Sequence, residues 1–545
     1  MIGPWRGFSR TQRKNIAIYV VGIMFYKFAL EWYNGAFITL ANERFGDDRY
    51  SNIGILTGLN YAMQCVGSII VAPLIKRYPT RSVLSTAVFV FGFISAILLI
   101  VDASTGGVMR FRTEDNTTKY GTWNPKGVGL PSFAYRPKWK TDHGNHLLAT
   151  ALSNIYHLRD IVGGDVQLVM FPDPDYDRDS WALHARQLRQ MDATVHVLYE
   201  VAGTIGAFSS VSLIGKFGYN YSFFLSPVFF TFAAITWRFV DGDRPKLSQS
   251  LEEFESEPSS PGYLPSVWSG FRSFFKATYY GAFLVFSHRK FVWLVSGYAL
   301  ALYGHRYLEN GLAPVFAKQV LGTSAWSQII VGGSNLGELF GAVSVLITSN
   351  YVRTPLPWLR LDAIALNIVW ILPFISVTRG KVADAWKIAA IFLPISYGWA
   401  AGDVSLAAYI QATLAKIESR DSDVSALGSV MAFLYVLYIV LYSILSTVLG
   451  RWIDNQVGSA TGDAAAASAR VALKYIGGVQ FTVLCVVVMV STFIPRGSFA
   501  FNPKDEDFNV DQASNFDNRS LDLRSDELGF VKTRETDTHS ESFRV

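Results

Sequence analysis

The feature that most constrains this fold is the apolar run from Ile16 to Leu40. An apolar segment of about twenty residues is long enough to cross the hydrocarbon core of a bilayer as a helix. Three polar side chains, Lys27, Glu31 and Asn34, interrupt the run. Ionisable groups are costly inside a membrane, and those that persist there usually serve a function. The sequence therefore predicts a membrane helix that carries functional polar groups.

A similar arrangement returns in the second half of the chain. Arg306, Glu309 and Asn310 interrupt an apolar run from Phe291 to Phe316. The thirteen residues that begin at Asn34 align without a gap on those that begin at Asn310, with four identities. Each copy opens a block of further apolar segments. We therefore predict a duplicated helical membrane protein with a polar pathway between its halves.

The composition supports a membrane protein and excludes several other classes. Half of the 545 residues are hydrophobic and only 17% are charged, against about 25% in soluble domains. Two cysteines cannot form a disulfide framework or a cysteine zinc cluster. The net charge of +5 is attributed to cytoplasmic loops rather than to nucleic-acid binding. We predict the lipid bilayer as a partner, and neither a metal nor a cofactor.

The order of apolar and polar segments predicts an all-α, polytopic fold of twelve spans in two six-helix bundles. The basic N-terminus is placed in the cytoplasm because positively charged loops stay on that side. The expected segments are a cytoplasmic N-terminus at 1–14, an N-terminal bundle at 15–240, a cytoplasmic linker at 241–289, a C-terminal bundle at 290–496 and a disordered cytoplasmic tail at 497–545.

Residues 103–192 do not fit this plan well. Topology requires a fourth span there, but the best candidate, at 143–171, contains several charged residues. We interpret it as a degraded span within an irregular insert; intron sequence retained in the gene model, particularly at Leu168 to Arg186, is one hypothesis. Asn116 begins an N-glycosylation pattern in the part of this loop that is predicted to lie outside.

Several segments resemble the major facilitator superfamily, particularly its fungal members. The turn after the second span keeps only Arg77 and Arg81 of the family's signature, and Lys76 replaces its acidic residue. The segment from Glu200 to Gly206 is similar to a glycine-rich motif of exporters without its proline. The resemblance implies two bundles that rock about a central site near the midplane. It also implies that Arg77 and Arg81 belong to a gating turn.

Proton coupling, which the resemblance suggests, requires a membrane-embedded carboxylate that can bind and release a proton. The candidate acids are Glu31, Glu200, Glu309, Glu338 and Asp403. Four of them have a structural alternative: a Lys27–Glu31 ion pair, headgroup contacts for Arg306 and Glu309, glycine-mediated helix packing around Glu338, and an interhelical hydrogen bond for Asp403. Trp399 and other aromatic residues are expected to line a pocket for an organic solute, or simply to pack.

These features predict a secondary active transporter of a small organic solute that alternates access between the two sides. Proton-coupled efflux of a metabolite or toxin is the first hypothesis, and proton-coupled nutrient uptake is its rival. A non-transporting receptor or regulator with the same fold is the third. No nucleotide-binding or hydrolase motif occurs, so an enzyme is not expected. The plasma membrane is favoured over the vacuolar membrane.

Overall fold

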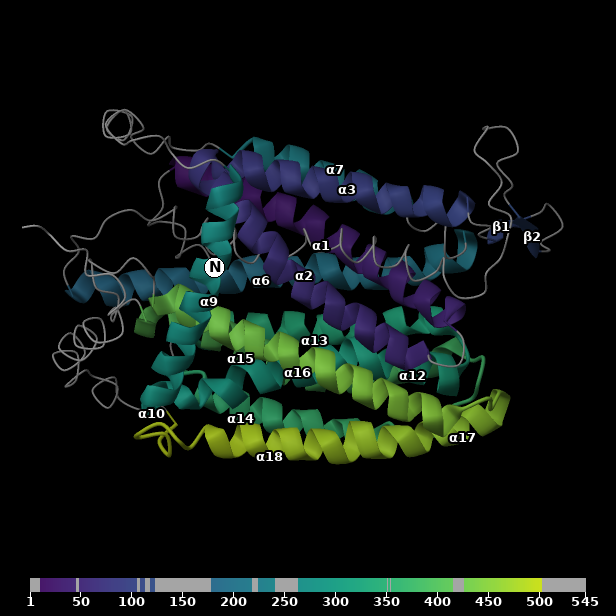
Figure 1. Ribbon diagram of the computed structural model, residues 1–545. Helices are drawn as coiled ribbons and strands as arrows, with labels where there is room; N and C mark the ends of the chain where they lie inside the picture. The colour runs from purple at the N-terminus through teal and green to yellow at the C-terminus, as the bar shows by residue number, and fades with distance from the viewer. Residues whose placement is uncertain are drawn as a thin grey trace, which may run out of the picture.

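The protein is a bundle of long helices that lie side by side (Figure 1). The computed structural model describes residues 10–45, 49–104, 108–112, 118–122, 178–217, 224–240, 263–349, 351–352, 354–414 and 426–501. Within these residues, seven helices are long and apolar enough to cross a membrane. The chain is an integral, multi-pass membrane protein, as the sequence predicts.

The N-terminal half has its core between its first, third and seventh helices, α1, α3 and α7. Its helices are α1 (Arg10–Arg44), α2 (Arg49–Arg77), α3 (Thr80–Ser104), α6 (Arg178–Phe217) and α7 (Leu225–Arg238). Tyr26, Phe91, Phe230 and Trp237 are buried between α1, α3 and α7. Their rings pack edge-on or tilted, and the ring centroids of Phe91 and Phe230 are 4.7 Å apart. Aromatic packing therefore holds this half together.

The described part of the irregular insert includes a hairpin that the sequence did not predict. Strands β1 (Val108–Arg112) and β2 (Thr118–Thr122) form an antiparallel hairpin in which Val108 pairs with Thr122. It lies beyond the end of α3, as Figure 1 shows. The expected fourth span at 143–171 and the glycosylation site at Asn116 fall outside the described residues. The hairpin is a small exception to an otherwise helical fold.

The C-terminal half consists of long helices and of segments in which π- or 3₁₀-helical turns break the α-helix; one of these, residues 295–321, is called the interrupted segment below. Its elements are α10 (Arg289–Val292), η4 (Val295–Leu300), α11 (Ala301–Tyr307), η5 (Leu308–Leu312), α12 (Ala313–Val315), η6 (Phe316–Leu321), η7 (Ser324–Trp326), α13 (Ser327–Thr348), α14 (Leu356–Ala365), η8 (Leu366–Ile371), α15 (Val382–Leu414), α16 (Ala426–Val457), α17 (Gly462–Leu473), η9 (Lys474–Gln480) and α18 (Phe481–Ser491). In the interrupted segment, π-helical turns alternate with α-helix from Val295 to Leu321. Such turns are rare and often mark functional positions.

The linker predicted at 241–289 is not a flexible connector over its whole length. Residues Tyr263–Ser287 form helix α9, which contacts α2 and α16. Leu284 and Val285 are buried in this contact. The acidic and Pro/Ser-rich residues before Tyr263 are typical of a flexible linker, whereas the aromatic residues that follow are typical of a packed helix. Helix formation here buries apolar surface that a flexible linker would expose.

Helices α13 and α15 approach each other unusually closely. A Cβ atom added at Gly333, Gly337 or Gly341 would lie 2.4, 2.2 or 2.5 Å from a backbone carbonyl oxygen of α15. No real side chain tolerates such distances, so the glycines allow the two backbones to touch. The predicted packing role of the glycines around Glu338 is confirmed. Glu338 is thereby held at a fixed place in the bundle.

The two halves meet along two helix pairs, α6 with α13 and α2 with α16. The second pair is also locked by polar contacts. The backbone N–H groups of Tyr50 and Ser51, at the start of α2, donate to the carboxylate of Asp454 on α16 at 3.0 and 2.8 Å. Gly450 lies against the carbonyl of Tyr50, where a Cβ atom would be only 2.5 Å away. A carboxylate of one half thus caps a helix of the other.

Candidate functional site

The candidate site is a network of charged side chains that begins at Lys27 on α1. Its Nζ atom lies 2.5 Å from Glu31 Oε1, one helical turn away, and 3.9 Å from Glu200 Oε2 on α6. It also lies 4.5 Å above the ring of Tyr199. A structural ion pair between Lys27 and Glu31 is therefore present, but it is not isolated. Lys27 connects α1 to the acids of α6.

Glu200 occupies the centre of this network, because its two oxygen atoms face different partners. Oε2 faces Lys27, whereas Oε1 lies 3.9 Å from Nε2 of His196. Glu338 of α13 approaches from the other half, and ligand atoms of His196, Glu200 and Glu338 lie within 4.8 Å of one another. One nitrogen and two carboxylate oxygens at this spacing form a set that can bind a cation or share protons.

Gly203 provides the space that Lys27 needs. A Cβ atom at this position would lie 2.4 Å from Cε of Lys27, well inside van der Waals contact. It would also lie 3.2 Å from Nδ2 of Asn335 and 3.3 Å from Oε2 of Glu200. Both of these atoms are buried, and neither has a hydrogen-bond partner among the residues that the structure describes. The glycine noted in the sequence therefore makes room for a cation beside Glu200 and borders a polar spot that is not fully satisfied.

A second branch of the network is centred on Glu309 in the interrupted segment. Its Oε2 lies 3.1 Å from Nη1 of Arg306, and its Oε1 accepts a hydrogen bond of 2.6 Å from Ser334 of α13. The hydroxyl of Ser334 is also 2.6 Å from that of Ser396 on α15. Glu309 is only 7% exposed, and the choice between cavity lining and headgroup contact for Arg306 and Glu309 stays a prediction. The Arg306 side chain remains 40% exposed.

The charges of the network do not balance with its fixed cations alone. It contains four carboxylates and two permanently charged side chains. These are Glu31, Glu200, Glu309 and Glu338, against Lys27 and Arg306. All four acids are at most 7% exposed. Unpaired buried charge is strongly unfavourable, so the surplus of two negative charges has to be neutralised by protons or by a bound cation.

Trp399 and Asp403, two further candidates from the sequence, lie on α15. Trp399 is buried and stacks on the ring of His305 at 4.7 Å, and His305 Nε2 lies 2.8 Å from Oδ1 of Asp362. Asp403 is half-buried one helical turn beyond Trp399 on α15. The role predicted for Asp403 stays a prediction. Trp399 packs against the buried His305–Asp362 pair, and its predicted role in lining a pocket also stays a prediction.

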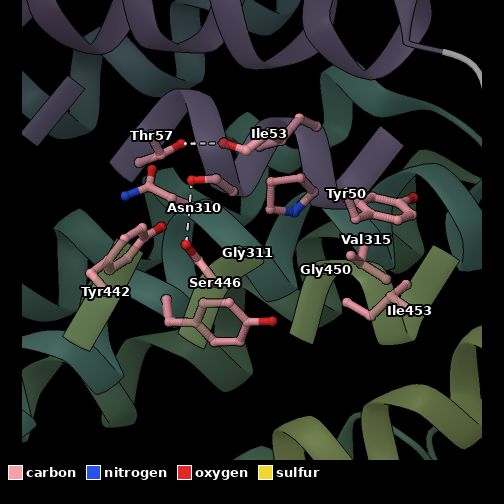
Figure 2. Close-up of a pocket in the computed structure, with 13 residues that line it drawn as sticks. Tyr50, Ile53, Thr57, Asn310, Gly311, Val315, Tyr442, Ser446, Gly450 and Ile453 are labelled. Carbon is pink, nitrogen blue, oxygen red and sulfur yellow. Dashed lines mark hydrogen bonds between the residues drawn. The ribbon is translucent and has the colours of Figure 1, made fainter. Parts of the chain in front are cut away.

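A small cavity lies between the two halves, next to the locked start of α2. Its volume is about 20 Å³, enough for roughly one water molecule. Figure 2 shows Asn310 and Gly311 on one side of it and Tyr442 and Ser446 of α16 on another. Asn310 therefore lines a space between the halves. Asn34, its counterpart in the alignment, is half-buried on α1.

Three tyrosines, Tyr61, Tyr438 and Tyr442, lie near Arg306. Tyr61 of α2 packs against Tyr438 and Tyr442 of α16 with ring centroids 5.4 and 5.0 Å apart. All three phenols are close enough to Arg306 to interact with it electrostatically. The ring of Tyr303 also packs against that of Tyr442, with centroids 6.1 Å apart. An arginine framed by phenols offers both hydrogen bonds and aromatic faces to a solute.

The turn after α2 makes its described hydrogen bonds within the N-terminal half. Nη1 of Arg81 donates to the carbonyl of Val240, at 2.8 Å, and Arg238 of α7 bonds to Ser82. Arg77 is the last residue of α2. These contacts tie α3 to the end of α7. A gating role for Arg77 and Arg81 stays a prediction.

Sequence reasoning missed several residues of the site. Ser334 and Ser396 were passed over because serine is common in membrane helices, although Ser334 lies one turn before Glu338 on the same face of α13. Asp362 and Asp454 were passed over because both lie near the ends of apolar segments, where acids are ordinary. Their contacts, across 57 and about 400 residues, appear only in the fold.

Comparisons with known proteins reveal likeness in fold but not in sequence. No family model and no curated protein matches the chain. A D-xylose-proton symporter of known structure is similar at 10% identity, with a TM-score of 0.54, over 90% of this chain and 98% of the symporter. The nucleoside transporter NupG, at 11% identity, gives a TM-score of 0.49 over 89% of this chain and 100% of its own. The chain has the major facilitator fold. At these identities the likeness establishes the fold alone.

Proposed function

We propose that this protein is a proton-coupled secondary transporter of a small organic solute. The observation that carries the proposal is the buried network that both halves share, with four carboxylates against two fixed cations. Glu200 belongs to the N-terminal half and Glu338 to the C-terminal half. When the halves move apart, these two acids separate, so their proton occupancy is coupled to the conformation.

Arg306 and the tyrosines around it form the proposed solute site. Arg306 is the most exposed charged group of the network and lies one turn from Glu309. A solute that bonds to Arg306 would compete with Glu309 for the guanidinium. Glu309 would then need another partner, and a proton can serve. This exchange links solute binding to proton binding within one helical turn.

We propose export of a metabolite or toxin as the physiological direction, with uptake of a nutrient as the second candidate. The similar symporter structure is named for proton-coupled movement of D-xylose, and alternating access operates in either direction. Comparison of solute pools inside and outside cells with and without this gene separates the two. A compound trapped inside the deletion strain supports export, and one left unused in the medium supports uptake. The plasma membrane is the proposed location.

The compound found in this way then serves for flux measurements with purified protein in liposomes. Glu200→Gln should abolish uptake driven by a pH gradient, because glutamine can neither bind nor release the proton. Exchange of labelled for unlabelled solute without a gradient should continue, since it requires no change in protonation. The matched control is Asp463→Asn, which alters an exposed acid at the start of α17.

The outcomes discriminate among the three hypotheses. Loss of both gradient-driven flux and exchange in Glu200→Gln would indicate a structural role and contradict the proton-binding role. Full gradient-driven flux in both Glu200→Gln and Glu338→Gln would remove this network from the mechanism. If no compound changes in either pool and liposomes show no flux, the receptor hypothesis is favoured instead.

A further inference from the structure

We infer that α9 is a membrane-surface helix that binds the anionic headgroups of the cytoplasmic leaflet and straps the two halves together there. Figure 1 shows α9 at the same end of the bundle as α10, running across the ends of the long helices. Its contacts agree with this placement. Tyr263 donates a hydrogen bond of 2.9 Å to the carbonyl of Ile70 in the last two turns of α2, and Gly281 touches Ser429 in the first turn of α16.

One face of α9 is fixed to the protein and spans both halves. At Gly281, a Cβ atom would lie 2.0 Å from the carbonyl oxygen of Ser429, so the helix rests directly on the backbone of α16. Leu284 and Val285 are buried beside this contact. Phe286, which is 61% exposed and belongs to the face described next, still reaches Phe433 of α16, with ring centroids 5.7 Å apart. The helix is therefore docked, and its remaining faces are free to meet the surroundings.

A second face of α9 carries a continuous apolar stripe. The stripe consists of Leu264, Trp268, Phe275, Tyr279 and Phe286, which are 61–76% exposed. With 100° of rotation per residue, these positions fall within an arc of about 60°. Five large exposed apolar side chains on one narrow arc would be a liability in water. In a membrane protein, the bilayer is the partner that covers such an arc.

A third face supplies the charge that suits a lipid surface. Arg272 and Lys276 are exposed and follow the edge of the apolar stripe at about 80° and 120° on the same wheel. Ser269 and Ser273 lie beyond them. Helices with aromatic residues on one face and basic residues beside them lie flat in the headgroup region. The basic N-terminus places this end of the bundle in the cytoplasm, where the leaflet is anionic.

The test measures the immersion of α9 in the intact protein, reconstituted in liposomes. Cys65→Ala and Cys485→Ala first remove the native thiols. Spin labels are then attached at Phe275→Cys, on the stripe, or at the matched control Ser273→Cys, on the polar face. Collision with oxygen, which concentrates in lipid, is compared with collision with a water-soluble nickel complex. We expect oxygen to dominate at position 275 and the nickel complex at position 273.

Lipid composition provides the second part of the test. The liposomes are made of phosphatidylcholine with or without phosphatidylserine. Each basic side chain near an anionic surface changes binding by about five-fold. The label at position 275 should therefore move deeper when phosphatidylserine is present, and Arg272→Gln with Lys276→Gln should remove this response. Both readouts are independent of solute flux.

Two outcomes would overturn the inference. Equal access of the nickel complex to positions 275 and 273 would show that the stripe faces water. Shielding of position 275 from both oxygen and nickel, in either lipid mixture, would show that a protein or a second copy of the chain covers the stripe. A variant that fails to insert is recognised by its loss from the liposome fraction, and Tyr279→Cys then provides a second stripe position.

Discussion

Removal of the Asp454 carboxylate should open the contact between α2 and α16. Asp454→Ala deletes two buried hydrogen bonds, of 3.0 and 2.8 Å, to the first backbone N–H groups of α2. Loss of a capping carboxylate costs about 0.5–2 kcal/mol, and a buried cap with two bonds belongs at the upper end of that range. These contacts exist only while the two halves are together. We therefore expect the form in which α2 and α16 are in contact (the closed form) to be destabilised by about 2 kcal/mol relative to the form in which they are apart (the open form).

Such a loss corresponds to a roughly 30-fold shift of the equilibrium. The assay follows a cysteine at Thr57, which lines the cavity beside this contact (Figure 2), in a protein without Cys65 and Cys485. Its rate of reaction with a membrane-impermeant thiol reagent should rise by up to about 30-fold in Asp454→Ala, as long as the open form remains the minor one.

The control and the refuting result are both defined by the fold. Asp463→Ala removes an exposed acid nine residues further along the chain and should leave the labelling rate unchanged. An unchanged rate in Asp454→Ala, with the protein folded and inserted, would refute the reasoning. It would mean that the packing of Gly54 and Gly450 against the partner backbones is sufficient to hold the two helices together.

The remaining predictions concern the C-terminal half. Gly337→Ala places a Cβ atom 2.2 Å from the carbonyl oxygen of Leu393, so the thermal midpoint of unfolding should fall by several degrees. The control is Gly215→Ala on α6, where an added Cβ atom has no neighbour within 4 Å, and it should leave the midpoint unchanged or raise it slightly. Asp362→Ala strips His305 of its buried partner and should destabilise the protein by about 3 kcal/mol. Restoration of stability by the double variant with His305→Phe would support the pairing, and equal stability of Asp362→Ala and wild type would contradict it.

The sequence was informative where a residue type conflicts with its surroundings. Lys27, Glu31 and Glu309 stand out because charged residues are rare in apolar runs, and all three belong to the central network. The glycines around Glu338 were interpretable because their four-residue spacing places them on one face of a helix. These conclusions need only local periodicity, so they required no knowledge of which helices are neighbours.

The sequence was uninformative where function depends on a distant partner. Nothing in the residues around Glu200 shows that Glu338 approaches it from the other half, because that contact arises from packing of α6 on α13. In the sequence, Asp454 is an ordinary acid near a helix end, and only the fold shows that it accepts hydrogen bonds from the start of α2. Helix α9 is different: its signal was present in the spacing of Trp268, Phe275 and Tyr279, but the polar residues before it obscured the pattern.

The surplus of negative charge in the central network also bears on the electrical behaviour of the protein. Moving one elementary charge across 100 mV is worth about 2.3 kcal/mol. If protons neutralise the surplus on one side of the membrane and leave it on the other, each cycle carries charge across the bilayer with a neutral solute. Membrane voltage then drives the cycle alongside the pH difference. Such a protein would keep working when the two compartments have the same pH, as long as the membrane stays polarised.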